Sequence, residues 1–196
     1  MAGQVGKTTA ERILDAAEQV FAERGFDGAS LGDVADRVGI RGPSLYNHFR
    51  NKRELYAAVL GRLLDPFFEL LEELLERPPS EARGDAAIEC MLHHHVAHPN
   101  LARLIQHAAL AGGDQLELLL KRWYHPFFQR IPELIPEAEQ QDQEGAGQLA
   151  AMLIGFNNMI LGYVTLAPLH EQLFGRDLLS EEAVKDYIRF LRQTVG

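Results

Sequence analysis

The chain has 196 residues, 46% of them apolar and 24% charged, and it carries a net charge of −9 at pH 7. These proportions are ordinary for a globular protein and exclude a wholly disordered chain. The single cysteine, Cys90, excludes a framework of internal disulfides and suits a reducing compartment.

No membrane segment is expected from the sequence. Residues 1–11 contain no apolar run of the kind found in signal peptides. The longest apolar stretch, residues 149–169, is about the length of a membrane span, but Asn157 and Asn158 lie at its centre, which favours a buried helix. We therefore expect a cytoplasmic protein with no membrane partner.

Helical start and stop signals begin near the N-terminus. Thr8 followed by Glu11 is a capping box, and Gly25 is the matching stop signal. Ser30, with an acidic residue three positions later, opens a second and shorter helix, which Gly39 ends. Apolar residues repeat at helical spacing in both segments, so each helix should present one face to a core.

A third and a fourth helix are predicted directly afterwards. Pro43 suits the first turn of a helix, where no amide partner is needed, and this helix should reach about Phe49. Asn51, with Glu54 three residues later, then starts a long fourth helix that Pro66 should kink.

The rest of the chain predicts more helices separated by short breaks. Strand patterning is nearly absent, so we expect an all-α fold of roughly nine helices. The segment 77–85 should end the fourth helix, and residues 132–147 are polar and typical of a loop. The next helix should end near Ala97, and another should run from Pro99 to about Ala111. A third should open with a capping box of Asp114 and Glu117, bend at Pro126 and end at Pro132. The last two should run from Gln148 to Leu166 and from Ser180 to Thr194.

The second and third helices have the spacing of a helix-turn-helix, whose second helix can lie in the major groove of DNA. Leu45 and Phe49 are four residues apart and should face the core. That leaves Ser44, Asn47 and His48 on other faces, with Tyr46 at the margin. Hydroxyl, amide and imidazole groups bond phosphates and base edges, so this helix is a candidate for binding DNA.

The charge pattern supports the same interpretation. The excess of acidic residues lies entirely after residue 60, whereas residues 39–53 contain no acidic residue. Four cations lie within that segment, and a distant acidic body would not cancel them because cellular salt screens charges over about 8 Å. The four cations are Arg41, Arg50, Lys52 and Arg53.

The run from Ser30 to Leu55, SLGDVADRVGIRGPSLYNHFRNKREL, resembles the DNA-binding head of the tetracycline-repressor (TetR) family of bacterial transcription regulators. The resemblance covers roughly residues 8–60, and it implies a helix-turn-helix domain at 1–50 and a helical ligand-binding and dimerisation domain at 51–196. It also implies a role for each residue of the motif. Tyr46, His48 and Lys52 would contact phosphates, Ser44 and Asn47 would approach bases, and Ser30 would cap the second helix against the DNA backbone.

Two positions depart from the family pattern. Arg41 stands where the family usually has a small hydroxyl that caps the recognition helix, so it would instead reach a guanine or a phosphate. Gly32 lies where some members extend a polar side chain into the groove, and that contact is expected to be lacking here.

The resemblance further implies a homodimer on a palindromic double-stranded DNA site, paired through the last two helices. The Gln148–Leu166 helix is apolar almost all round, so burial on every side is expected, either inside the chain or against a partner. The terminal helix adds Val184, Ile188 and Leu191 to this prediction.

The family also places a small-molecule pocket in the body, and a repressor released by a mainly apolar or aromatic effector is the expected function. Apolar walls with a few polar groups are typical of such sites, although an ordinary aromatic core with hydrogen-bonded asparagines is equally compatible with this pattern. The candidate lining residues are Phe67, Phe68, His94, Trp123, Phe127, Asn157 and Asn158.

The histidine run between His93 and His98 supports an alternative function. His94 and His98 are four residues apart on one helix face, so a metal- or heme-binding helical bundle, either a sensor or an enzyme, is the competing hypothesis. The Glu-x-x-His pairs of carboxylate-bridged bundles are lacking, and so are the motifs of hydrolases and dinucleotide enzymes. We therefore expect no enzyme activity, no metal and no cofactor.

Overall fold

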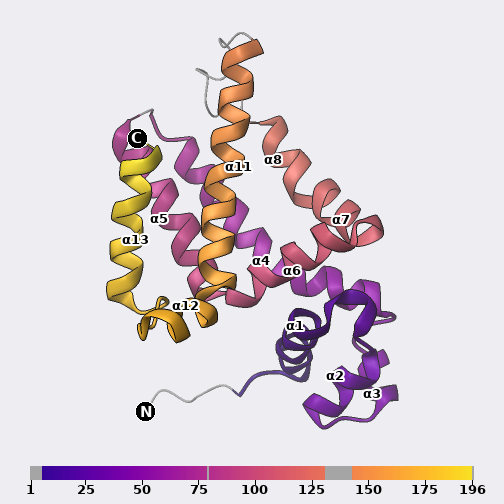
Figure 1. The fold of residues 1–196 in the computed structure, drawn as a ribbon. Helices are drawn as coiled ribbons and strands as arrows, with labels where there is room; N and C mark the ends of the chain where they lie inside the picture. Colours follow the sequence, from indigo (N-terminus) through magenta and orange to yellow (C-terminus); the bar gives the residue numbers. More distant parts are fainter. Residues whose placement is uncertain (1–5, 79, 131–142, 196) are drawn as a thin grey trace, which may run out of the picture.

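The computed structural model describes residues 6–78, 80–130 and 143–195, and nearly all of these are helical (Figure 1). No strand occurs within these ranges. The all-α prediction is confirmed. In the same ranges, no helix is both long enough and apolar enough to cross a bilayer.

The first two helices begin and end as their capping residues predict. α1 (Thr9–Gly28) has the expected capping box at Thr8, and α2 (Leu31–Val38) has the one at Ser30. Gly25 has φ 68°, which interrupts the helical geometry of α1 near its end, and Gly39 has φ 74° at the end of α2. Glycine adopts these left-handed angles without steric cost, which explains why the chain turns at these two positions.

The third helix is shorter than predicted. α3 (Gly42–Tyr46) begins with Pro43 in its first turn, but Asn47 and His48 form a turn and not a continuation to Phe49. The amides of His48 and Phe49 both bond the carbonyl oxygen of Leu45, at 2.9 and 3.0 Å. This tighter turn places Leu45 and Phe49 together in the core of the head, with exposed fractions of 0% and 9%.

The fourth helix, α4 (Lys52–Leu75), connects the head to the body and remains one helix through Pro66. Asn51 caps it by accepting a hydrogen bond from the amide of Glu54, as predicted. Pro66 has no amide to donate to the preceding turn. A side chain from α5 (Glu81–Ala97) bonds that turn, because Nε2 of His94 lies 2.8 Å from the carbonyl oxygen of Leu63.

The body contains α6 (Pro99–Ala111), α7 (Gly113–Leu119), a π-helical turn η1 (Leu120–Tyr124) and α8 (His125–Gln129). The bend expected at Pro126 is preceded by this π-helical turn. The prediction of a capping box at Asp114 is wrong, since Gly112 is the N-cap of α7 and no side chain caps this helix. Asp114 instead forms an ion pair with Arg53 of α4 at 3.1 Å. Pro132 lies outside the described residues.

The C-terminal part contains α11 (Gln143–Thr165), α12 (Ala167–Phe174) and α13 (Glu181–Val195), and α12 was not predicted. α11 begins five residues before the predicted start at Gln148. Of the two alternatives for this helix, burial on every side inside the chain does not hold, because Ile154 of α11 is 62% exposed; burial against a partner stays a prediction. By contrast, Val184, Ile188 and Leu191 of α13 are buried inside the chain.

Candidate nucleic-acid interface

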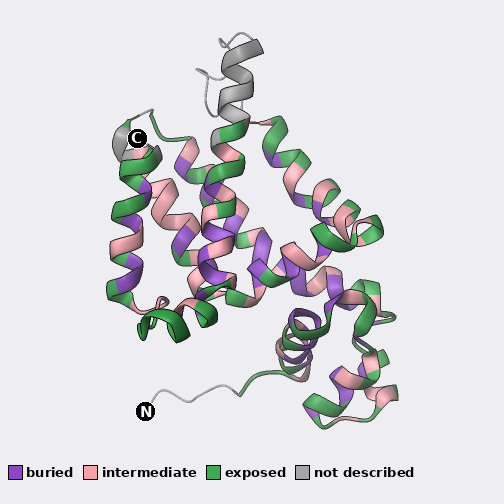
Figure 2. Ribbon diagram, in the orientation of Figure 1, coloured by how far each residue is buried: buried purple, intermediate pink, exposed green. Residues whose placement is uncertain are grey.

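α3 and the turn after it present polar side chains to solvent at the end of the molecule opposite α8 and the start of α11 (Figures 1 and 2). Tyr46 is 56% exposed, Asn47, His48 and Arg41 are exposed, and Ser44 is half-buried. Because the core side chains Leu45 and Phe49 face inward, the structure brings the predicted contact residues together on the outer surface of the motif.

Arg41 is the N-cap residue of α3, and its side chain makes no capping hydrogen bond. The guanidinium group has no partner among the described residues, and the side chain is exposed. The departure from a capping hydroxyl therefore leaves a cation at the start of the recognition helix, where it is free to bond a phosphate or a base.

Ser30 uses its hydroxyl inside the protein. Its Oγ donates to Oδ2 of Asp33 at 2.6 Å and accepts from the Asp33 amide at 3.0 Å. These hydrogen bonds, together with the ion pair to Arg24, lower the pKa of Asp33 below its usual value. The capping part of the prediction for Ser30 is confirmed, and the approach of this end of α2 to a DNA backbone stays a prediction.

Lys52 makes contacts that the sequence did not indicate. Its Nζ donates to the carbonyl oxygens of Phe26 at 2.8 Å and Ala29 at 3.0 Å, and lies 4.4 Å from the centre of the Phe26 ring. The half-buried ammonium group thus bonds the end of α1 to the start of α4. A lysine ammonium has three donors, so a phosphate contact would have to use the remaining one.

Several acidic residues of the head are paired with cations away from α3. Glu23 forms a two-point ion pair with Arg37 at 2.9 Å, which lowers the pKa of this carboxyl group. Asp33 pairs with Arg24 at 2.7 Å, whereas Glu54 accepts a hydrogen bond from the backbone amide of Arg50 at 3.0 Å. The surface formed by α3 therefore presents cations and neutral polar groups, an arrangement suited to a polyanion.

In the body, the predicted aromatic candidates meet in one cluster between α4, α5 and α8. Phe67 and Phe68 are in contact, with ring centres 5.2 Å apart, and Phe67 lies 4.8 Å from His94. The ring centre of Phe68 lies 5.2 Å from that of Phe127 and 5.6 Å from that of Tyr124. Phe67 and Phe127 are buried, so the cluster is part of the core.

Trp123 is buried beside this cluster, and its Nε1 donates to Oδ1 of Asp65 at 2.6 Å. Asp65 also pairs with Arg122 at 3.3 Å, and the Arg122 guanidinium lies 4.7 Å from the centre of the Trp123 ring. Asp65 was not identified from the sequence as a partner of Trp123. An acidic residue next to Pro66 in an apolar stretch could have indicated such a polar contact.

The two asparagines do not join the cluster as expected. Asn158 is exposed in the single chain, and its place in a ligand site stays a prediction. Asn157 is half-buried on α11, and its place in a ligand site stays a prediction.

The histidines are engaged with the backbone. His94 bonds the Leu63 carbonyl, and Nδ1 of the buried His95 lies 2.8 Å from the Met91 carbonyl oxygen. Burial, together with the nearby charges of His98 and His95, lowers the pKa of His94 to about 4. Within the described ranges, no three His, Cys, Asp or Glu residues are arranged to bind a metal ion, so this geometry gives the metal- or heme-binding alternative no support.

Comparison with known proteins agrees with the geometry of the head. Residues 13–59 match the family model described as bacterial regulatory proteins, tetR family. The chain is 48% identical over 54 residues to the HTH-type transcriptional activator FasR of Mycolicibacterium smegmatis, covering 28% of this chain and 25% of FasR. It is 35% identical over 100 residues to the HTH-type transcriptional repressor KstR2 of Mycobacterium tuberculosis, covering 48% of this chain and 50% of KstR2. The matches thus span a quarter to a half of these relatives.

Solved structures share the fold over nearly the whole chain. The transcriptional regulator FadR from Bacillus subtilis, solved in complex with stearoyl-CoA, aligns with a TM-score of 0.65 and 18% identity, covering 95% of this chain and 99% of FadR. A putative fatty acid metabolism regulator from Clostridium perfringens aligns with a TM-score of 0.68 and 17% identity, covering 94% of this chain and 96% of that protein. Taken with the helix-turn-helix, the match to the family model identifies residues 13–59 as a DNA-binding head of the kind found in the tetR family of bacterial regulatory proteins.

Proposed function

We propose that the chain is a DNA-binding transcriptional regulator, a repressor that a small molecule releases from a palindromic operator. The observation that carries the proposal is the exposed surface of the helix-turn-helix at α3, where polar side chains face solvent. These are Arg41, Tyr46, Asn47 and His48, and Leu45 and Phe49 are buried on the opposite side. A helix of this kind enters the major groove with its polar side chains toward bases and phosphates. Such a regulator acts in the cytoplasm.

Each exposed residue has a proposed role that follows from its chemistry. Tyr46 and His48 bond phosphates, which fixes the register of the head on the duplex. Ser44 and Asn47 approach base edges, since an amide can bond adenine through two hydrogen bonds. Arg41 bonds a guanine or a phosphate from the start of α3. Residues 1–50 form the DNA-binding domain, and residues 51–196 bind the effector and the second subunit.

The proposed homodimer rests on large apolar side chains that are exposed on the C-terminal helices. Among these helices, α12 lies at the lower left of Figure 2 and is largely exposed. Phe174 is 73% exposed and Leu173 is 65% exposed, values that are unusual for large apolar side chains in a folded chain. One recognition helix reads only a few base pairs, so two heads about one helical turn apart are needed for useful specificity. The large apolar residues that are exposed in this part of the chain are Ile154, Leu166, Leu169, Leu173, Phe174 and Phe190.

The proposed effector is mainly apolar, because the candidate site around Phe67, Phe68 and Phe127 is aromatic. Long-chain acyl-CoA thioesters are the first class to test, since a regulator with the same fold was solved with stearoyl-CoA. A ligand that enters this cluster displaces α4 at Pro66, and α4 begins at the DNA-binding head. Such a ligand lowers DNA affinity if it prefers the displaced state.

Selection from random double-stranded DNA with the full chain at moderate salt tests the proposal. We expect enrichment of a palindrome whose half-sites are about one helical turn apart. Addition of a saturating acyl-CoA to the complex should then release the DNA. If no sequence is enriched, the regulator hypothesis fails, whereas an enriched operator that is unaffected by acyl-CoA contradicts only the proposed ligand class.

A further inference from the structure

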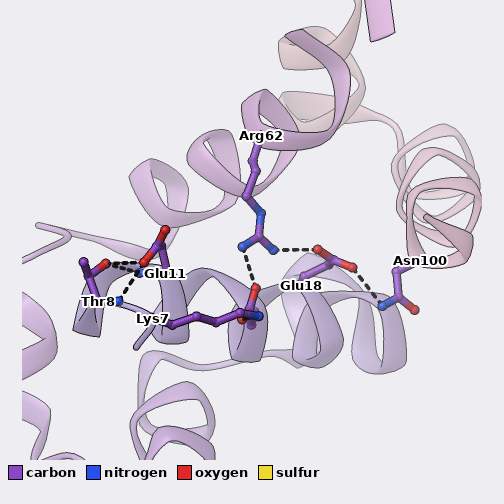
Figure 3. A network of polar contacts seen from close by, with 7 residues as sticks. Lys7, Thr8, Glu11, Glu18, Arg62 and Asn100 are labelled. Atoms are coloured by element: carbon purple, nitrogen blue, oxygen red, sulfur yellow. Dashed lines mark hydrogen bonds and ion pairs between the residues drawn. The ribbon is translucent and has the colours of Figure 1, made fainter. Parts of the chain in front are cut away.

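A polar network joins the first helix of the head to two helices of the body (Figure 3). Asp15 and Glu18 lie one turn apart on α1, and both bond the guanidinium group of Arg62 on α4. Glu18 also accepts a hydrogen bond from the side-chain amide of Asn100 at the start of α6. Three helices from distant parts of the sequence therefore meet at one carboxylate.

The geometry of this network is well defined. Nη1 of Arg62 lies 2.7 Å from Oδ1 of Asp15, and Nη2 lies 2.6 Å from Oε2 of Glu18. The two oxygens of Glu18 are used by different helices, since Nδ2 of Asn100 lies 3.1 Å from Oε1. A guanidinium group is planar and offers its donors in fixed directions, so these bonds define an angle as well as a distance between α1 and α4.

The network is partly shielded from water. The side chain of Glu18 is 17% exposed and that of Arg62 is 30% exposed, which is less than for most ion pairs in this chain. Asp15 also bonds Lys7 at 2.7 Å, and its pKa is lowered by Lys7 first and by Arg62 next. Both carboxyl groups thus face cations or amide donors, and the charge of Arg62 is matched on α1.

α1 also contacts α6 at a second point farther along the helix. A Cβ atom on Gly25 would lie 3.4 Å from Nδ1 of His107, so the backbone of α1 approaches α6 closely there. With the Glu18–Asn100 bond, α1 is attached to α6 at two separated positions, which resists a rotation of the head. α4 joins this attachment through Arg62 near the middle of α1, and Lys52 bonds α4 separately to the end of α1.

We infer that Arg62 and Glu18 are positioning residues that set the orientation of the head on the body, and therefore the half-site spacing that the dimer accepts. This inference rests on the proposed DNA-binding function. Adding one base pair between half-sites moves them apart by about 3.4 Å and rotates one by about 35°. A head whose angle to α4 is set by the Arg62 bonds resists this change, whereas a head that lacks these bonds and keeps only the Lys52 and Tyr56 contacts to α4 follows it more easily.

Spacing selectivity is therefore the measurement that tests the inference. The operator selected by the wild-type chain is prepared with its own spacing and with one base pair added or removed, and affinities are compared at one salt concentration. For Arg62→Met, which keeps the apolar stem, we expect the ratio of affinities for native and altered spacing to fall by about fivefold or more. Affinity for a single half-site should not change, because no group on α3 is altered.

Two further variants complete the design. Glu18→Gln keeps the shape of the side chain but removes the charge, and it should lower spacing selectivity in the same direction while leaving a folded protein. Arg37→Met removes an ion pair of the same kind that lies wholly within the head, between α2 and Glu23 of α1, so spacing selectivity should stay at the wild-type value. Circular dichroism verifies that each variant is helical before its affinity is measured.

The outcomes separate this inference from the proposed function. If the wild type binds its operator with a spacing preference that Arg62→Met and Glu18→Gln both retain, the inference is wrong and the regulator function stands. If all three variants lose selectivity equally, general loosening of the head is the cause and the specific role of Arg62 is refuted. If the wild type selects no DNA sequence, the proposed function itself has failed.

Discussion

Replacing Lys52 by methionine should lower the stability of the head and leave the salt dependence of DNA binding unchanged. The substitution keeps the apolar stem over Phe26 but removes the ammonium group that donates to the carbonyl oxygens of Phe26 and Ala29. The sequence motif alone predicts the opposite, a phosphate contact whose loss makes the salt slope shallower by about one unit. The variant therefore distinguishes two physical roles of one residue.

The magnitude follows from the bonds that are lost. Hydrogen bonds from a charged donor contribute about 1.5–3 kcal/mol each when the partner stays buried. The carbonyl groups at the end of α1 lie beside exposed residues, Asp27 and Gly28, so water replaces part of the loss. We expect the free energy of unfolding to fall by about 2–3 kcal/mol, which for a chain of this length lowers the Tm by about 5–10 °C.

The assay measures thermal unfolding and operator affinity at several salt concentrations for Lys52→Met and for Arg41→Met. Arg41 is exposed and has no partner among the described residues, so its loss should leave the Tm unchanged. If Arg41 contacts a phosphate, the slope of log affinity against log salt becomes shallower by about 0.9. An unchanged Tm for Lys52→Met, combined with a slope that is shallower by about one unit, would refute the structural role of this lysine.

Three further predictions concern the reading of bases, the pH dependence and the dimer. Asn47→Ala should cost about 1–3 kcal/mol at particular base positions and little at others, which affinities for single-base variants of the operator measure; a uniform loss would instead indicate a phosphate contact. His94 has a pKa of about 4 in the folded chain against an ordinary value of 6.5, so the unfolded state binds more protons between these values and stability falls as the pH drops through this window. His94→Gln should remove this part of the pH dependence of the free energy of unfolding. If urea unfolding of the variant shows the same pH dependence as the wild type, the prediction for His94 is wrong. Phe174→Asp places a charge on the exposed apolar surface, so light scattering should show a monomer at concentrations where the wild type is a dimer, and an intact dimer would exclude α12 from the interface.

The sequence determined the elements whose ends depend on neighbouring residues. Capping boxes at Thr8 and Ser30, a left-handed glycine at Gly39 and a proline in the first turn of α3 are local signals, and the structure contains all four. The helix-turn-helix and its exposed polar side chains follow from the same short-range spacing. A local signal failed where a distant residue competed for the same side chain. At Asp114 the carboxylate pairs with Arg53 and does not cap α7.

Only the tertiary structure decided which side chains meet across the chain. Lys52 reaches α1, 23 and 26 residues away in sequence, and Arg62 reaches α1 across 44 and 47 residues. Spacing along a helix shows which face a residue occupies, but not which helix packs against that face. The same reason applies to α11, where the apolar sequence left burial inside the chain or against a partner open, and only packing shows that Ile154 is exposed in the single chain. Contacts between helices depend on the relative placement of whole elements, and a local pattern of residue types does not encode that placement.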